Sequence, residues 1–210
     1  MLDITIKRIY YRNKNIIKDV RIILSKPGIY GFFGKNGSGK TTFLKSFSKT
    51  VSFEGSIKLN NKELSEKKVA WIPTEPFLYE YLTIKEFYDF FSFTTRDLTP
   101  LNEKIFEIDD SKLLKECSTG TQKKAFINAV FQFCNYDIYI FDEPFNGLDI
   151  EANYILLNKI IDLAKTKFVI ISSHIIEIIE PYLNEKYYVS DCSIKRIDDK
   201  IQMKNYFINE

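Results

Sequence analysis

The sequence is poor in the residues that mark disulfide-built and membrane-spanning proteins. Its 210 residues include three cysteines and one histidine. Cys117, Cys134 and Cys192 lie far apart, with no CxxC pair and no histidine cluster beside them, which favours reduced cytosolic thiols. No run reaches the ~18 apolar residues that a transmembrane helix requires. The first eight residues alternate with charges and lack the apolar segment of a signal peptide.

An excess of charge of one sign is also absent. Lysine and arginine total 30 against 28 acidic residues, so the net charge is +2 and no strong field favours nucleic acid or an anionic membrane. With 45% hydrophobic residues the composition is that of a globular protein. We therefore expect a cytoplasmic chain without a nucleic-acid partner. Any membrane-spanning part of its system would belong to another polypeptide.

Strand signals dominate the first 60 residues, and helical spacing follows. Thr83 is expected to cap a helix, with Glu86 completing a capping box. Shorter helical patterns fall within 100–117. The remaining predicted elements are strands over 2–9, 20–24, 29–33, 53–59, 137–141 and 168–172, and helices over 40–47, 121–133, 151–164 and from 175 to 179, before Pro181.

Alternating strands and helices predict an α/β fold with a mostly parallel sheet. The strand-rich start adds an N-terminal antiparallel β part, and the central helices form a small inserted helical lobe. We expect a single domain over 1–210, with a core of 1–74 and 122–210 and a lobe of about 75–121. Ligands in such folds bind beyond the carboxyl ends of the strands.

A glycine-rich segment follows the strand over 29–33 and opens the next helix. It reads Gly34, Lys35, Asn36, Gly37, Ser38, Gly39, Lys40, Thr41 and then Thr42, and it fits GxxxxGK[ST] at every fixed position. Its backbone N–H groups and the helix N-terminus attract phosphate oxygens. Lys40 would reach the β- and γ-phosphates, and Thr41 would offer its hydroxyl to Mg²⁺. The segment predicts a P-loop NTPase, without separating ATP from GTP.

Two adjacent acids, Asp142 and Glu143, end the apolar run over 137–141. Burying charge costs several kcal/mol unless a metal or donor compensates, so acids at a strand end invite a functional interpretation. Asp142 would hold Mg²⁺, and Glu143 would polarise the attacking water as general base. Taken alone, such a pair could equally be a solvated turn.

Five motifs in this order resemble the ATP-binding cassette (ABC) ATPases, specifically the nucleotide-binding subunits of ABC transporters. The segment 34–42 resembles their Walker A motif and 140–144 their Walker B strand. Residues 145–149 resemble the D-loop, 172–174 the switch strand, and 117–122 the signature. The resemblance runs from about Leu2 to Asp199 and implies that the nucleotide is ATP with Mg²⁺.

The resemblance also implies residue roles. His174 would contact the γ-phosphate, and Asp149 would cross between subunits. Because ATP is sandwiched in a head-to-tail dimer in this family, Ser118 and Gly120 would act on the partner's nucleotide. Tyr11, or alternatively Tyr10, would stack on adenine, although a packing role for it is nearly as well supported.

The sequence departs from the family pattern at three places. The signature has Thr119 in place of a glycine, a variant that resembles exporter ATPases. Thr74 stands at the usual glutamine of the Q-loop, beside the expected Mg²⁺, where a short hydroxyl reaches less far. The segment from Thr74 to Ser118 is shorter than usual, which implies a reduced lobe.

The leading hypothesis is therefore an ATPase subunit of an ABC transporter, with export favoured. It would lie on the inner face of the cell membrane, bound to separate membrane subunits through residues 77–79, which could alternatively belong to the lobe core. A homodimer and a heterodimer remain alternatives. A weakly catalytic regulatory cassette and a soluble ABC ATPase acting on ribosomes or DNA are competing hypotheses, although the chain has neither the second cassette nor the long coiled coil of the latter.

Overall fold

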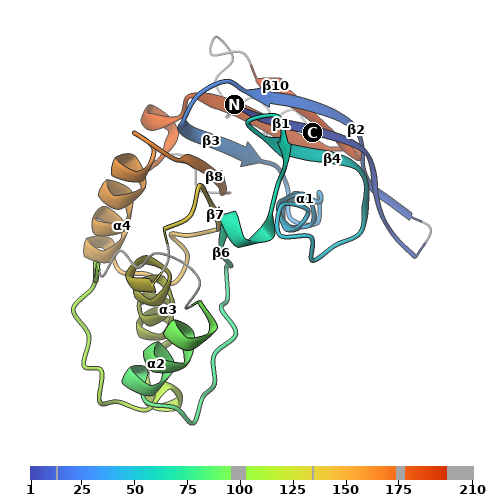
Figure 1. The fold of residues 1–210 in the computed structure, drawn as a ribbon. Coiled ribbons are helices and arrows are strands. Elements are labelled where there is room, and N and C mark those ends of the chain that lie inside the picture. Colours follow the sequence, from blue (N-terminus) through green and yellow to red (C-terminus); the bar gives the residue numbers. More distant parts are fainter. Residues whose placement is uncertain (13, 96–102, 134, 174–177, 198–210) are drawn as a thin grey trace.

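The computed structural model describes residues 1–210 except 13, 96–102, 134, 174–177 and 198–210 (Figure 1). Its N-terminal part is a four-stranded antiparallel sheet in the order β2-β1-β4-β5. The strands are β1 (Leu2–Tyr11), β2 (Lys14–Leu24), β4 (Phe53–Leu59) and β5 (Lys62–Glu63). Apolar residues alternate along β1 and face the core, as the period of a half-buried strand requires.

A six-stranded sheet forms the centre, in the order β10-β9-β3-β8-β7-β6. Its strands run parallel except for the β9–β10 pair. Every residue of β3, β7 and β8 is buried, because both faces of the sheet are covered. The strands are β3 (Gly28–Phe33), β6 (Val69–Ile72), β7 (Ile138–Asp142), β8 (Phe168–Ser172), β9 (Glu185–Ser190) and β10 (Ser193–Ile197).

Helices α2 and α3 lie together at one end of the molecule, away from the N-terminal sheet (Figure 1). The predicted capping box of α2 is present, since Thr83 Oγ1 accepts from the N–H of Glu86 and Glu86 accepts from the N–H of Thr83. The helices are α1 (Lys40–Lys45), α2 (Ile84–Thr94), α3 (Thr119–Phe133) and α4 (Ile150–Leu163), with 3₁₀ turns η1 (Glu66–Lys68), η2 (Leu114–Glu116) and η3 (Glu180–Tyr182).

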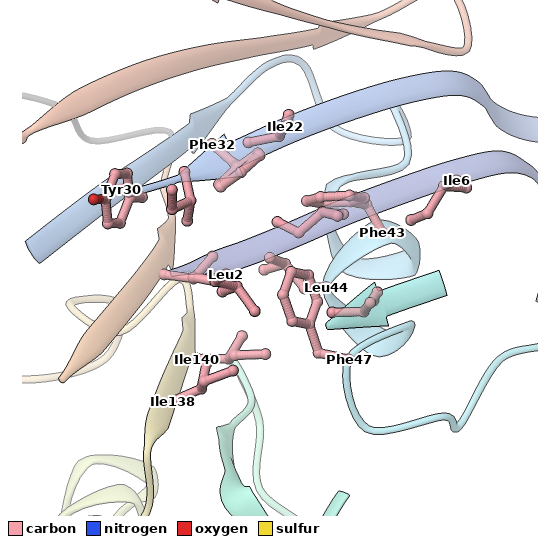
Figure 2. Close-up of a cluster of buried hydrophobic side chains, with 14 of the residues drawn as sticks. Leu2, Ile6, Ile22, Tyr30, Phe32, Phe43, Leu44, Phe47, Ile138 and Ile140 are labelled. Atoms are coloured by element: carbon pink, nitrogen blue, oxygen red, sulfur yellow. The ribbon is translucent and has the colours of Figure 1, made fainter. Parts of the chain in front are cut away.

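The largest hydrophobic cluster joins the two sheets through α1 (Figure 2). Phe43 and Phe47 of the α1 segment contact each other edge to face, with ring centroids 5.6 Å apart, and Phe43 also meets Phe32 of β3. Leu2 and Ile140 belong to the same cluster and are fully buried. This packing fixes the start of α1 against the carboxyl end of β3.

The expected fold class, an antiparallel N-terminal part and a mostly parallel sheet, is confirmed. Several boundaries differ: β2 begins at Lys14 rather than 20, α1 ends at Lys45 rather than 47, and α3 begins at Thr119 rather than 121. The hairpin of β9 and β10 was not predicted. Residues 175–177 of the helix expected at 175–179 lie outside the described residues.

The expectation of two helical patterns within 100–117 is wrong for the residues described there. Only the short η2 is helical between 103 and 117. One reason is a buried side chain, Asn128 of α3. Its Oδ1 accepts from the N–H groups of Ile105 and Phe106, and its Nδ2 donates to the Phe106 carbonyl. Further along, the carbonyls of Asp110 and Lys112 accept from the first two N–H groups of α2, so much of this stretch bonds to other segments instead of forming a helix.

Candidate nucleotide-binding site

The P-loop connects the end of β3 to the first residue of α1. Gly37 and Gly39 have φ of 80° and 104°, in the left-handed region that glycine adopts without strain. Gly39 also passes close to β2, because a Cβ placed there would lie 3.0 Å from Ile16 Cγ2. The loop therefore turns back over the helix N-terminus, with its backbone facing one cavity.

Lys40 lies inside this loop, with only 6% of the residue exposed. Its Nζ donates to the carbonyls of Gly34 at 2.7 Å and Lys35 at 3.1 Å. Burial lowers the pKa of Lys40, while the nearby charges of Glu143 and Asp142 oppose that shift. The loop thus encloses a cation.

A buried hydroxyl beside Lys40 indicates what the loop binds. Within the described part of the chain, the buried Oγ of Ser38 has no hydrogen-bond partner. Buried polar groups in native proteins almost always have one, so an unpaired hydroxyl points to an acceptor from outside the chain. A phosphate oxygen, next to the Lys40 ammonium and the α1 N-terminus, fits this position.

Asp142 ends β7 beside the P-loop and is 3% exposed. Thr41 Oγ1 donates to Asp142 Oδ2 at 2.7 Å, and Ser172 Oγ of β8 donates to Asp142 Oδ1. Thr74, which follows β6, donates its hydroxyl to the Asp142 carbonyl at 3.1 Å. Hydroxyl and carboxylate oxygens are the ligands that Mg²⁺ prefers, so the pair Thr41 and Asp142 fits this ion.

Glu143 follows in an unusual backbone conformation, with φ of 50°. Its N–H donates to the Ser172 carbonyl at 3.1 Å and lies 3.3 Å from Ser172 Oγ. Its carbonyl accepts from Lys123 Nζ at 2.9 Å. A non-glycine residue in the left-handed region costs about 1–3 kcal/mol, and these bonds on both sides hold it there.

These segments enclose a cavity of about 440 Å³. Eight of the predicted site residues lie around this cavity. Ile16 and Asn146 complete the lining and were not singled out from the sequence. The lining residues are Ile16, Asn36, Gly37, Gly39, Lys40, Thr41, Thr42, Thr74, Glu143 and Asn146.

The other predicted site residues that the structure describes do not line this cavity. Ser118 and Gly120 lie at the start of α3, where Ser118 Oγ is 3.0 Å from Thr121 Oγ1. Asp149 caps α4, accepting from the N–H of Ala152 at 2.8 Å and from Lys124 Nζ at 2.6 Å. Tyr11 ends β1 and is 65% exposed. His174 lies outside the described residues.

Two interactions at the site escaped the sequence analysis. Ser172 bonds to the carboxylate of Asp142, and Lys123 bonds to the carbonyl of Glu143. The register pair Asp142–Ser172 of β7 and β8 explains the first contact, and the predicted neighbouring strands could have indicated it. No local sequence pattern distinguishes Lys123 from the adjacent Lys124, although the ammonium of Lys124 bonds to a different residue, Asp149.

Comparison with known proteins identifies the family. The family profile described as ABC transporter matches residues 17–146. The ABC transporter ATP-binding protein YtrB of Bacillus subtilis is 28% identical over 207 residues, covering 92% of this chain and 70% of YtrB.

Solved structures share the fold. The structure of an ATP-binding subunit of an ABC transporter has a TM-score of 0.84 at 24% identity, covering 100% of this chain and 98% of that one. The dimeric post-hydrolysis structure of the ATP-binding cassette MJ0796 bound to ADP and Pi has a TM-score of 0.74 at 16% identity, covering 96% and 100%. Within the described residues, no helix is long and apolar enough to cross a membrane. Because the family profile spans more than half of the chain, the protein belongs to the ATP-binding subunits of ABC transporters and is an ABC ATPase.

Proposed function

We propose that this ATPase hydrolyses Mg-ATP in a head-to-tail dimer and thereby drives export through membrane subunits on separate chains. The observation that carries the proposal is the shared cavity of Lys40, Thr41 and Glu143, with Asp142 directly behind Thr41. A buried cation, an unpaired Ser38 hydroxyl and two acids at a strand end are groups that can bind a triphosphate and assist its hydrolysis.

Each of these groups has one task in the proposed mechanism. The P-loop N–H groups, Ser38 and Lys40 bind and orient the phosphates, while Thr41 and Asp142 would hold Mg²⁺. The ion would neutralise phosphate charge when bound. Glu143 orients a water and accepts its proton as the water oxygen bonds to the γ-phosphorus. The bond from that phosphorus to the bridging oxygen breaks, and ADP and phosphate leave.

Ser118 and Gly120 do not line the cavity of their own chain, which supports a second cassette as part of the complete site. We propose that the partner's signature closes over the nucleotide, as the two-subunit arrangement of the related MJ0796 dimer suggests. Asp149, held by Lys124 at the surface, would contact the partner. In this arrangement the exposed ring of Tyr11 stacks on adenine and His174 contacts the γ-phosphate.

The proposed contact with the membrane subunits lies on the lobe of residues 75–121. Phe77 is 80% exposed and Tyr79 48%, and they meet edge to face with ring centroids 5.6 Å apart. With Tyr81 and Phe90 they line an open cavity of about 470 Å³. An exposed aromatic patch of this kind is typical of an interaction surface. Binding there would hold the ATPase on the inner face of the cell membrane.

A second candidate function rests on Thr74. Its hydroxyl lines the cavity but bonds to the Asp142 carbonyl, and it has no long amide to span the site. A cassette with this substitution could serve as the weakly catalytic half of a heterodimer. The two proposals differ in whether the chain closes on a copy of itself.

Light scattering on the purified Glu143→Gln protein, with and without Mg-ATP, separates them. The amide cannot accept the proton, so ATP stays bound. A shift from 24.7 kDa to about 50 kDa supports a homodimeric motor. A monomer that binds ATP supports the heterodimer instead. The Lys40→Ala, Glu143→Gln double variant is the control, because it should lose ATP binding and remain monomeric. Retention of ATP by that control would contradict the P-loop assignment.

A further inference from the structure

A buried lysine behind the site takes no direct part in the mechanism above. Lys123, in the second turn of α3, is 3% exposed. Its Nζ donates to the carbonyl of Glu143 at 2.9 Å and to the carbonyl of Asn146 at 2.9 Å. Burying an ammonium costs free energy unless hydrogen bonds compensate for the lost water, so the two carbonyl partners of Lys123 are needed to hold it there. Burial lowers the pKa of Lys123 to about 8, opposed by the carboxylates of Glu143, Asp142 and Glu75.

The two carbonyls belong to the two ends of one turn. Asn146 N–H closes the turn on the Glu143 carbonyl at 3.4 Å, and Glu143 holds φ of 50°. The N–H of Glu143 is already fixed by Ser172 in β8. Lys123 fixes the opposite side of the same residue, so the backbone of Glu143 is held between the sheet and α3.

Both ends of this turn face the nucleotide cavity. Glu143 and Asn146 line it, and Asn146 also lines a second cavity of about 430 Å³ that Lys123 borders. Lys123 thus lies behind the turn and has no place in the lining of the nucleotide cavity. Its ammonium bonds to the carbonyl of Glu143 and to that of Asn146 at the other end of the turn.

Gly120 and Lys124, which lie near Lys123 in α3, also contact the segment 143–149. Gly120 packs against the Gly147 carbonyl, and Lys124 pairs with Asp149 at 2.6 Å. The start of α3 and the segment 143–149 therefore form one unit, with the ammonium of Lys123 at its buried centre.

We propose that Lys123 is a positioning residue for hydrolysis, which holds the Glu143–Asn146 turn so that the carboxylate of Glu143 faces the attacking water. The inference rests on the proposed role of Glu143 as general base. A general base displaced by a fraction of an ångström loses much of its effect, so the turn needs such support.

The test compares Lys123→Met, which keeps the length of the side chain without a donor, with Lys123→Gln, which keeps two N–H donors without the charge. Lys165→Met is the matched control, because Lys165 is 69% exposed and pairs only with Asp162 on the surface. We expect Lys123→Met to lower kcat between about tenfold and a hundredfold, as small misplacements do, while KM and the Kd for Mg-ATP stay within about twofold. Lys123→Gln should lower kcat less than Lys123→Met does, and Lys165→Met should leave kcat unchanged.

A second measurement is independent of turnover. Amide hydrogen exchange in the segment 143–149 should accelerate in Lys123→Met and stay unchanged in Lys165→Met. Wild-type kcat in Lys123→Met, or unchanged exchange in that segment, would overturn the proposal. Loss of the folded state in both variants would assign Lys123 to stability alone and would also overturn it. If Glu143→Gln hydrolyses ATP at the wild-type rate, the role of Glu143 fails instead, and exchange still decides whether Lys123 holds the turn.

Discussion

Gly120 at the start of α3 lies so close to Gly147 that a Cβ added to it would be 2.7 Å from the Gly147 carbonyl oxygen. Real Cβ atoms do not approach a carbonyl so closely, and both groups are backbone, so one segment must move. In an exposed helix, glycine to alanine would add up to about 1 kcal/mol of stability. Here we expect Gly120→Ala to lower the free energy of unfolding by about 1–3 kcal/mol, as overpacking does.

Denaturant unfolding of Gly120→Ala measures this. The neighbouring Thr119→Ala is the control, because Thr119 is exposed and its change should stay within about 0.5 kcal/mol. An unfolding free energy of Gly120→Ala at or above that of the wild type would contradict the close contact.

The hydroxyl of Ser172 links the two acids of the site. It donates to Asp142 Oδ1 and lies 3.3 Å from the N–H of Glu143, with no exposed surface. Ser172→Ala leaves that carboxylate oxygen without this donor, which costs about 1–3 kcal/mol. We expect a lower midpoint of thermal unfolding and slower ATP hydrolysis.

The Ser172→Ala protein should be compared with Ser48→Ala, whose exposed hydroxyl bonds to the Lys45 carbonyl. We expect a fall of about 2–4 °C per kcal/mol in the midpoint for Ser172→Ala and almost none for Ser48→Ala. Equal midpoints and equal ATPase rates for the two variants would show that the Ser172 bond contributes nothing.

Contiguous patterns made most of the fold predictable. The strands over 53–59 and 168–172 have the predicted bounds, because short apolar runs flanked by polar turns specify them locally. The helical expectation for 103–113 is wrong because partners distant in sequence, Asn128 and the start of α2, bond to its backbone. The strand expected from residue 20 begins at Lys14 instead, since pairing with β1 continues across the charged Lys18 and Asp19 to Ile17 and beyond.

The residues of the candidate site also divide into those that a local sequence pattern predicts and those that it does not. The P-loop and the two acids were predictable because their chemistry is concentrated in eight or fewer adjacent residues. Ile16 and Lys123 come from segments distant in sequence, and only the folded chain brings Ile16 to the cavity and Lys123 to the Glu143 carbonyl. Residues that support a site from behind carry no local signature, because the groups that they touch are backbone carbonyls.

The capping box of α2 gives a pH-dependent contribution to stability. Hydrogen bonds from the backbone N–H and the hydroxyl of Thr83 hold the pKa of the Glu86 carboxyl below its usual 4.5. Because the folded-state pKa is depressed, this stabilisation is present above pH 4.5 and is lost as the pH falls through the folded value. Glu86→Gln should therefore lower the thermal midpoint at pH 7 and approach wild type below that range.

Thermal scans of wild type and Glu86→Gln from pH 7 downward check this prediction. Thr83→Ala removes the cap at every pH, so it should lower the free energy of unfolding by about 1 kcal/mol throughout. A difference between wild type and Glu86→Gln that grows as the pH falls would have the wrong sign for a depressed pKa.

Phe77 and Leu78 are adjacent in sequence but differ in environment. Phe77 is 80% exposed, whereas Leu78 is 9% exposed and packs in the lobe cluster with Ile84 and Phe87. Phe77→Ala should therefore change the free energy of unfolding by no more than about 0.5 kcal/mol. Leu78→Ala should cost about 2–5 kcal/mol through the cavity that it leaves.

Urea unfolding of the two variants separates a surface role from a core role for the segment 77–79. If both alanine variants are destabilised alike, Phe77 belongs to the lobe core and the aromatic patch loses its place as a contact for membrane subunits. If only Leu78→Ala is destabilised, the exposed ring of Phe77 does not contribute to the stability of the fold. Phe77→Ala should then bind Mg-ATP as tightly as the wild type, because the aromatic patch shares no lining residue with the nucleotide cavity.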